Sequence, residues 1–303
     1  MRYHAYRMFL KKEVVMSNKL YKKTYSGWLA TPGFFIFLLI FVIPTAASFY
    51  FGFCRWNLHT TTWTGFENFQ QFFTMYNTKN AIPNTVVFAL VGTFMKVVPG
   101  LLISVWLVNG SKTQNYLKSV LFMPSLLGSV VIAAAWSSIM EPTGILNQLL
   151  GTMGIEPIGW LTDKGWAMAS IIFVDVWQGI GTTLVIYIGG LSAIPKTYYE
   201  AAAIDGVGPV QKFFKITLPL VVPSINSVLT LSLIHGFKHY ELVMSLTNGG
   251  PAFSTEVIGS AVYKLFSSAN YGIATTGYLI IFVVASCIVI PINRWVASRV
   301  EEF

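Results

Sequence analysis

Long apolar runs constrain this chain more than any other feature, because about six of them are each long enough to cross a lipid bilayer. They cover residues 28–53, 84–108, 116–140, 166–190, 220–246 and 271–295. A transmembrane helix needs about 20 mostly apolar residues. Charged residues make up only 11% of the chain, against about 25% in average soluble domains. We therefore expect an all-α polytopic membrane protein with about six transmembrane helices.

The first run also fits a second interpretation, a cleaved signal peptide. It follows a basic segment and contains Ala46 and Ala47 after an apolar core, which is the order of features in a secretory signal. Apolar residues continue past the alanines as far as Phe53. That length favours an uncleaved span.

Basic residues are distributed unequally between the two sides of these spans. The segments that would share one side hold Lys112, Lys118, Lys196, Lys212, Lys215, Arg294, Arg299 and a basic N-terminal cluster of Arg2, Arg7, Lys11, Lys12, Lys19, Lys22 and Lys23. The loops of the other side hold Arg55, Lys79, Lys164 and Lys264. By the positive-inside rule, both termini are expected in the cytoplasm, with residues 1–27 as a basic cytoplasmic segment.

The net charge of +8 does not indicate a nucleic-acid partner. The basic residues flank apolar runs and do not form a patch interleaved with aromatic residues on a soluble domain. The chain lacks the P-loop pattern G-x-x-x-x-G-K-[ST], so we expect no P-loop ATP site. It also lacks H-E-x-x-H and C-x-x-C, so we expect no metal site. Cys54 and Cys287 are expected near opposite sides of the membrane and unpaired.

A polar segment over residues 198–219 separates the fourth and fifth runs. It opens with helix formers and then reaches Gly206 and Gly208, which permit the positive φ of a sharp turn. Pro209 suits the first turn of a new helix. Pro219 is expected to end that helix, because the residue before a proline is disfavoured in the helical region. The segment therefore predicts two short helices joined by a turn.

This segment resembles the EAA motif of permease subunits in binding-protein-dependent ABC importers: Glu-Ala-Ala, a glycine a few residues later, then Ile-x-Leu-Pro. In that family it forms a coupling helix that docks into a groove on the cytoplasmic ATPase. The resemblance implies a type I ABC importer permease fold over residues 28–303. It assigns ATPase coupling to Glu200, Ala201, Ala202, Asp205, Gly206, Lys212, Phe213, Ile216, Leu218 and Pro219.

Three loop motifs resemble those of the carbohydrate-uptake group of this family, related to maltose, glycerol-3-phosphate and oligosaccharide systems. They are W-x-G-x-x-N-F at 63–69, G-x-x-N at 144–147 and T-x-G-G-P at 247–251. The last is either a tight outer turn or a contact with a binding protein. The resemblance implies a bacterial cell membrane, a sugar or oligosaccharide substrate, a second homologous permease, an ATPase dimer that binds ATP and Mg²⁺, and an extracytoplasmic solute-binding protein. It also implies a non-catalytic chain without a cofactor of its own.

Polar side chains inside the spans are the candidates for a substrate path, because ionisable groups there are costly and usually functional. Aromatic rings beside hydrogen-bonding groups suit a sugar. The candidates are Asp175, Trp177, Gln178, Asn226, His235, Lys238, Tyr240 and Asn248. Alternatively, these groups form hydrogen bonds between helices. Lys96 either lines the path or pairs with Asp175, and Glu241 could pair with Lys238.

Three other functions are consistent with parts of the sequence. One is an ABC importer for another solute, such as an amino acid, phosphate or a polyamine. Another is an ion-coupled secondary transporter, although the inverted repeats typical of that class are not evident. A third is a membrane-embedded enzyme, for which Asp175 and His235 would have to supply the acid and base.

Overall fold

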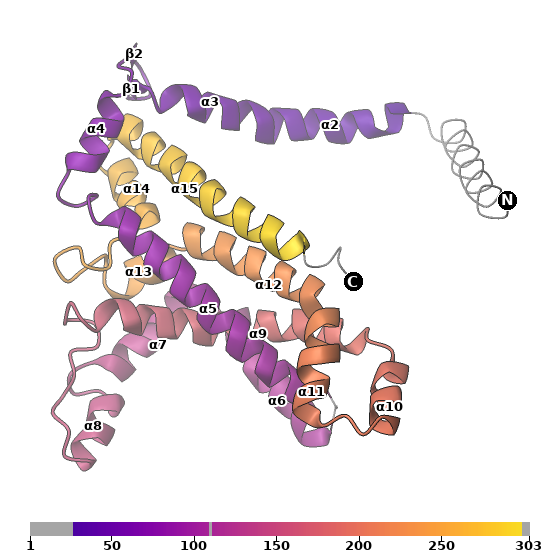
Figure 1. Cartoon of the computed structure of the whole chain (residues 1–303). Coiled ribbons are helices and arrows are strands. Elements are labelled where there is room, and N and C mark those ends of the chain that lie inside the picture. The colour runs from indigo at the N-terminus through magenta and orange to yellow at the C-terminus, as the bar shows by residue number, and fades with distance from the viewer. Residues whose placement is uncertain (1–26, 109–110, 299–303) are drawn as a thin grey trace. The chain divides into compact units, whose positions relative to one another are not determined.

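The structure, a computed structural model, describes residues 27–108 and 111–298 (Figure 1). The chain divides into two compact units, Met1–Tyr50 and Phe51–Phe303, and each is considered by itself. The basic cluster predicted to be cytoplasmic lies outside the described residues.

The described part of the first unit is one apolar helical run. Its segments are η1 (Gly27–Ala30), α2 (Thr31–Phe37), η2 (Leu38–Val42) and α3 (Ile43–Phe51), whose last residue belongs to the second unit. The run Trp28–Phe51 is long and apolar enough to cross a membrane. The short η2 is a π-helical turn directly before Pro44, whose missing amide hydrogen such a turn can accommodate. The helix continues through Ala46 and Ala47.

Four long helices form the centre of the second unit. They are α5 (Ala81–Leu107), α9 (Ala167–Ser192), α12 (Leu218–Lys238) and α15 (Tyr271–Ser298). Helix α5 packs against α9 and α12, and α12 also packs against α15 (Figure 1). Small residues permit these crossings. A Cβ at Gly236 would lie 2.8 Å from the Cα of Ala89, and one at Gly100 would lie 2.6 Å from Cγ2 of Thr183.

The third predicted span is wrong as a single helix over residues 116–140. The chain instead forms α6 (Lys112–Phe122), η3 (Met123–Leu126), α7 (Ser129–Met140) and α8 (Ile145–Thr152). The break has a local cause, because Pro124 has no amide hydrogen and Gly128 takes an extended backbone with ψ of 144°. The membrane candidate here is Ser129–Thr152, and the described residues contain six such candidates, as predicted.

The fifth predicted span also differs from the structure at both ends. After α10 (Lys196–Ile204), α11 (Pro209–Lys212) continues through the π-helical η4 (Phe213–Thr217) into α12. The predicted stop at Pro219 is wrong, because the helical run continues through this proline. The π-helical η4 ends two residues before Pro219, and such a turn can accommodate its missing amide hydrogen. The predicted end at residue 246 is wrong too. Helix α12 ends at Lys238, His239 is extended, and α13 (Glu241–Leu246) is a separate helix.

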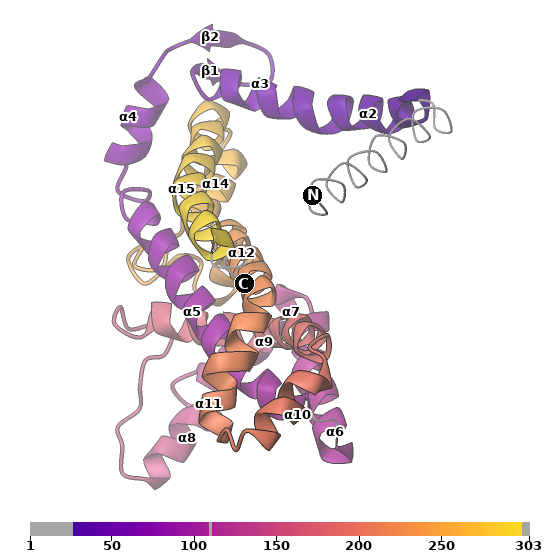
Figure 2. The ribbon, with the colours of Figure 1, turned by 45° about the vertical axis from the view of Figure 1, so that its right-hand side comes forward.

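The remaining elements of the described residues are two short strands and two short helices. They are β1 (Cys54–Trp56), β2 (Thr61–Trp63), α4 (Glu67–Thr74) and α14 (Ile258–Ser267). The two strands pair antiparallel, and α14 packs against α15. Within the second unit, α4 and the strands lie at one end and α10 and α11 at the other (Figure 2).

Candidate functional site

The α10–α11 hairpin has a sharp turn built on one glycine. Gly206 has φ of +70°, and its amide donates to the carbonyl of Ala203 at 3.2 Å. The amide of Val207 donates to the carbonyl of Ala202 at 2.9 Å. These two bonds form a Schellman motif, in which the left-handed residue is usually glycine. Gly208 has φ of −69°, so the positive φ expected at both glycines is found at Gly206 and not at Gly208.

The base of this hairpin is joined to the membrane helices. The hydroxyl of Tyr199 lies 3.0 Å from that of Thr217, which connects α10 to η4. Ala202 is buried, and Phe213 packs on a cluster of buried side chains from α5, α9 and α12. The hairpin is therefore supported by the bundle and not free to pivot.

The outer surface of the hairpin carries exposed apolar side chains that the sequence analysis missed. Ile204 is 87% exposed, Val210 70% and Phe214 60%. Among the predicted coupling residues, Glu200, Ala201 and Asp205 are also exposed, while the following are half-buried: Lys212, Phe213, Ile216, Leu218 and Pro219. Apolar side chains at the tip of a polar turn were the signal available in the sequence. An exposed surface of this kind suits docking into a partner's groove.

A buried ion pair joins α5 to α9. The Nζ of Lys96 lies 2.6 Å from Oδ2 of Asp175, and their side chains are 4% and 2% exposed. On the other side of the carboxylate, Nε2 of His235 from α12 lies 3.4 Å from Oδ1. The Lys96–Asp175 pair considered from the sequence is therefore formed. The suggested pair between Lys238 and Glu241 is not found among the described residues, because α12 ends between them.

Asp175 also has two histidines near it, so the group has the composition of a metal site. Ligand-type atoms of Asp175, His235 and His239 all lie within 4.8 Å of one another. A motif search missed this group because its members come from two helices. The ammonium of Lys96 already neutralises the carboxylate, and a divalent cation beside it would be repelled. The arrangement therefore fits an ion pair with histidine neighbours better than a metal centre.

A cavity of about 460 Å³ lies between α5, α9 and α12. Its polar side chains are Lys96, Thr182, Thr183, Ser232, His235 and Lys238. Two of the predicted substrate-path residues, His235 and Lys238, line it. Lys238 also borders a second cavity of about 580 Å³, which Tyr240 lines and which is otherwise mostly apolar.

The other predicted substrate-path residues lie elsewhere. Trp177 packs edge-on against Trp136, with ring centroids 5.5 Å apart. Gln178 donates to the carbonyl of Leu127 at 3.1 Å. The side-chain oxygen of Asn226 is buried and has no hydrogen-bond partner in the described part of the chain. Asn248 lies in the loop after α13.

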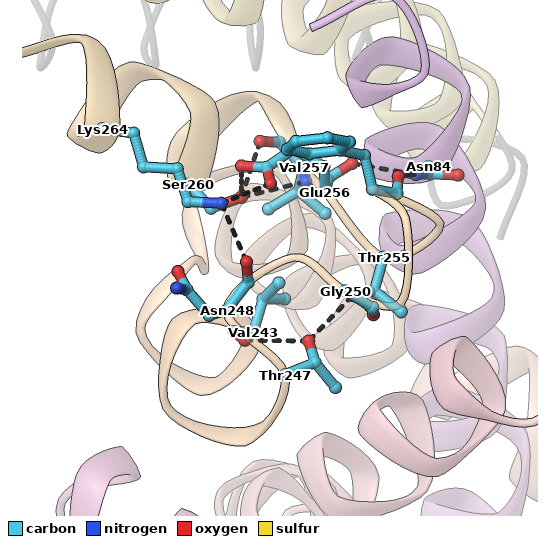
Figure 3. Close-up of polar contacts among 11 residues, drawn as sticks. Asn84, Val243, Thr247, Asn248, Gly250, Thr255, Glu256, Val257, Ser260 and Lys264 are labelled. Carbon is cyan, nitrogen blue, oxygen red and sulfur yellow. Dashed lines mark hydrogen bonds and ion pairs between the residues drawn. The ribbon is translucent and has the colours of Figure 1, made fainter. Parts of the chain in front are cut away.

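That loop is held by the fully buried Glu256 (Figure 3). Its Oε2 lies 2.6 Å from Nζ of Lys264, and its Oε1 accepts from the hydroxyl of Ser260 at 2.8 Å. Lys264 also donates to the backbone carbonyl of Asn248 at 2.8 Å. The T-x-G-G-P motif is therefore tied to α14 by a charged side chain.

The hydroxyl of the threonine of this motif bonds to the last turns of α13, where it lies 3.1 Å from the carbonyl of Val243, and to the loop (Figure 3). The hydroxyl of Thr247 lies 2.8 Å from that of Thr255, which donates to the carbonyl of Gly250 at 2.6 Å. Gly249 has φ of +79°, and a Cβ there would lie 1.9 Å from Oε2 of Glu256. The motif therefore forms a tight turn, and its contact with a binding protein stays a prediction.

The asparagines of the other two loop motifs have similar structural roles. Asn68 is buried and donates to the carbonyls of Gly52 and Cys54 at 3.1 and 2.9 Å. Asn147 is buried, and its side-chain oxygen accepts from the amide of Ile158 at 2.9 Å and from Nε1 of Trp160 at 3.1 Å. These side chains satisfy backbone and indole groups of irregular loops, which would otherwise be unpaired.

Comparison with known proteins agrees with this architecture. Residues 96–302 match the family described as "Binding-protein-dependent transport system inner membrane component". The probable ABC transporter permease protein YesP of Bacillus subtilis is 33% identical, with 82% of this chain and 81% of that protein covered. The multiple sugar-binding transport system permease protein MsmF of Streptococcus mutans is 29% identical, with coverages of 86% and 91%.

A solved structure shows the same fold. The crystal structure of a bacterial ABC transporter involved in the import of the acidic polysaccharide alginate matches with a TM-score of 0.75 at 24% identity, over 95% of this chain and 98% of that chain. This likeness and the six membrane candidates confirm the expected fold, an all-α multi-pass membrane protein of the ABC importer permease type. The chain belongs to the family of inner-membrane components of binding-protein-dependent transport systems.

Proposed function

We propose that this chain is the membrane subunit through which an ATP-driven importer carries a sugar or an oligosaccharide into a bacterial cell. Its relatives support the substrate class, since they include MsmF and the trehalose/maltose permease protein MalF of Thermococcus litoralis. The observation that carries the proposal is the α10–α11 hairpin. It presents an exposed carboxylate and exposed apolar side chains at one end of the unit, while its base is packed into the bundle.

The partners follow from the family. A second homologous permease completes the path, and a cytoplasmic ATPase dimer binds ATP and Mg²⁺ and docks on the hairpin. An extracytoplasmic solute-binding protein delivers the sugar; one structural relative was solved with an alginate pentasaccharide-bound periplasmic protein. This chain is non-catalytic, holds no cofactor and binds no nucleic acid. Both of its termini lie in the cytoplasm.

The continuous helix after the hairpin supplies a mechanical link. The helical run Pro209–Lys238 contains 30 residues, which corresponds to about 45 Å at 1.5 Å per residue. One end carries the coupling surface and the other carries His235 and Lys238. A displacement of the hairpin by the ATPase therefore moves the wall of the 460 Å³ cavity, as alternating access requires.

The first test uses the complex purified from its own membrane. An ATPase, a second permease and a solute-binding protein should co-purify, and the binding protein can then be screened against sugars. Glu200→Ala should leave the complex assembled but abolish the stimulation of ATP hydrolysis by the loaded binding protein, with uptake reduced at least about tenfold. Glu156→Ala is the matched control, because Glu156 is also exposed but lies far from the hairpin in the loop after α8.

Two results would contradict the proposal. Normal uptake by Glu200→Ala would remove the coupling role of the hairpin. Solute transport by the isolated chain, without an ATPase, would instead support an ion-coupled secondary transporter.

A further inference from the structure

We propose that the cavity between α5, α9 and α12 binds an anionic carbohydrate, one that bears a carboxylate or a phosphate group. This inference rests on the proposed function as a sugar importer and narrows its substrate class. The charge of the cavity wall is the observation that leads to it.

The wall is cationic. Two lysines and one histidine line the cavity, and none of the described lining residues is acidic. Asp175 lies behind the wall and is almost fully buried, with Oδ2 engaged by Lys96. Lys96 and Asp175 therefore cancel, and Lys238 remains as a net positive charge. Lys238 has no ion-pair partner in the part of the chain that the structure describes.

Such a charge in or at the edge of a membrane span is costly to retain. Lys238 is exposed, so an anionic group on a ligand can reach its ammonium, and the attraction between the opposite charges would offset that cost. His235 lies one turn before Lys238 and is 50% exposed, so its imidazole adds a hydrogen-bonding group beside the ammonium. The recognition element is therefore the charge of Lys238 with His235 next to it on one helix.

The rest of the wall suits a sugar ring better than a bare ion. The hydroxyls of Thr182 and Ser232 line the same cavity, and leucine, isoleucine and valine side chains provide apolar surface. A volume of about 460 Å³ falls in the range of small-molecule sites, roughly 300–1,000 Å³. A salt bridge to a carboxylate of the partner permease would not need this volume or these hydroxyls.

Cysteine protection in the assembled complex tests the site directly. The probe is Ser232→Cys in a Cys287→Ser background; Cys287 is exposed, whereas Cys54 is buried and can stay. The measured quantity is the rate of labelling at position 232 by an uncharged methanethiosulfonate. The competing ligands are a panel of uronate oligosaccharides and their neutral counterparts, with digalacturonate and galactobiose as the first pair.

We expect the uronate to protect at a concentration at least about tenfold lower than the neutral sugar, which corresponds to about 1.4 kcal/mol. Lys238→Gln should remove this preference and Lys238→Arg should retain it. Lys164→Gln, an exposed lysine on a loop, serves as the matched control and should change nothing.

The results that would contradict the anionic site differ from those that would contradict the proposed function as a sugar importer. Equal protection by both sugars, or an unchanged preference in Lys238→Gln, would overturn the anionic site and leave the sugar importer standing. Protection by neither ligand type, together with failure of every sugar in the uptake assay, would overturn both.

Discussion

The ion pair between Lys96 and Asp175 yields a prediction whose size follows from its burial. Both side chains are almost completely shielded, and Nζ lies 2.6 Å from Oδ2. Removing one partner of such a pair leaves an uncompensated buried charge and costs about 3–5 kcal/mol. Lys96→Met should therefore destabilise the protein by an amount within this range, because it leaves the buried carboxylate of Asp175 without its ammonium partner.

Replacing both partners should cost less than replacing either. Apolar residues of similar volume often substitute for a buried ion pair at little or no cost, so Lys96→Met combined with Asp175→Leu should recover most of the lost stability. The assay is thermal unfolding of the detergent-solubilised complex followed by size-exclusion chromatography. Lys112→Met is the control, since Lys112 is exposed at the start of α6. A double variant destabilised by the sum of the single effects would refute the reasoning.

Two further predictions concern the loops. Gly249→Ala should destabilise the loop after α13 by more than the roughly 1–2 kcal/mol of left-handed strain, because the new Cβ would also displace the carboxylate of Glu256. The control is Gly151→Ala, whose site is open, and the same thermal assay should show no such loss of stability for it. Asn147→Leu should lower the stability of the protein by about 1–3 kcal/mol for each group left unpaired, including the indole of Trp160. An unchanged unfolding temperature would contradict the structural role of this asparagine.

The loop motifs show where sequence patterns and structure diverge. Asn68, Asn147 and Thr247 stand out in the sequence as family signatures, and the structure shows them bonded within their own loops or to a neighbouring segment. A pattern records that a residue type is needed at a position without recording its contacts. Isoleucine is usually buried, and only the position of Ile204 at the tip of a polar turn indicated that its side chain would be exposed.

The errors in the predicted spans also arise because a sequence pattern does not record the contacts and hydrogen bonds of a residue. The sequence pattern predicted a helix stop at Pro219 and an unbroken helix through Pro124 and Gly128. In the structure, the helical run continues through Pro219 after a π-helical turn, while the chain leaves the helical conformation at Leu127 and Gly128, which follow the short helix that contains Pro124. Whether a proline breaks a helix depends on where its missing amide hydrogen falls in the hydrogen-bond pattern, and apolar periodicity does not contain that information.

By itself, the sequence determined that this chain crosses a bilayer several times and carries a polar hairpin between its fourth and fifth spans. Both are local properties, because the length of an apolar run and the conformational preferences of glycine and alanine act over a few neighbouring residues. Only the tertiary structure decided that Lys96 meets Asp175, and that His235 and Lys238 border one cavity with Lys96. Contacts between residues on separate helices depend on where those helices cross, and small residues such as Gly100 and Gly236 determine those crossings through packing distances.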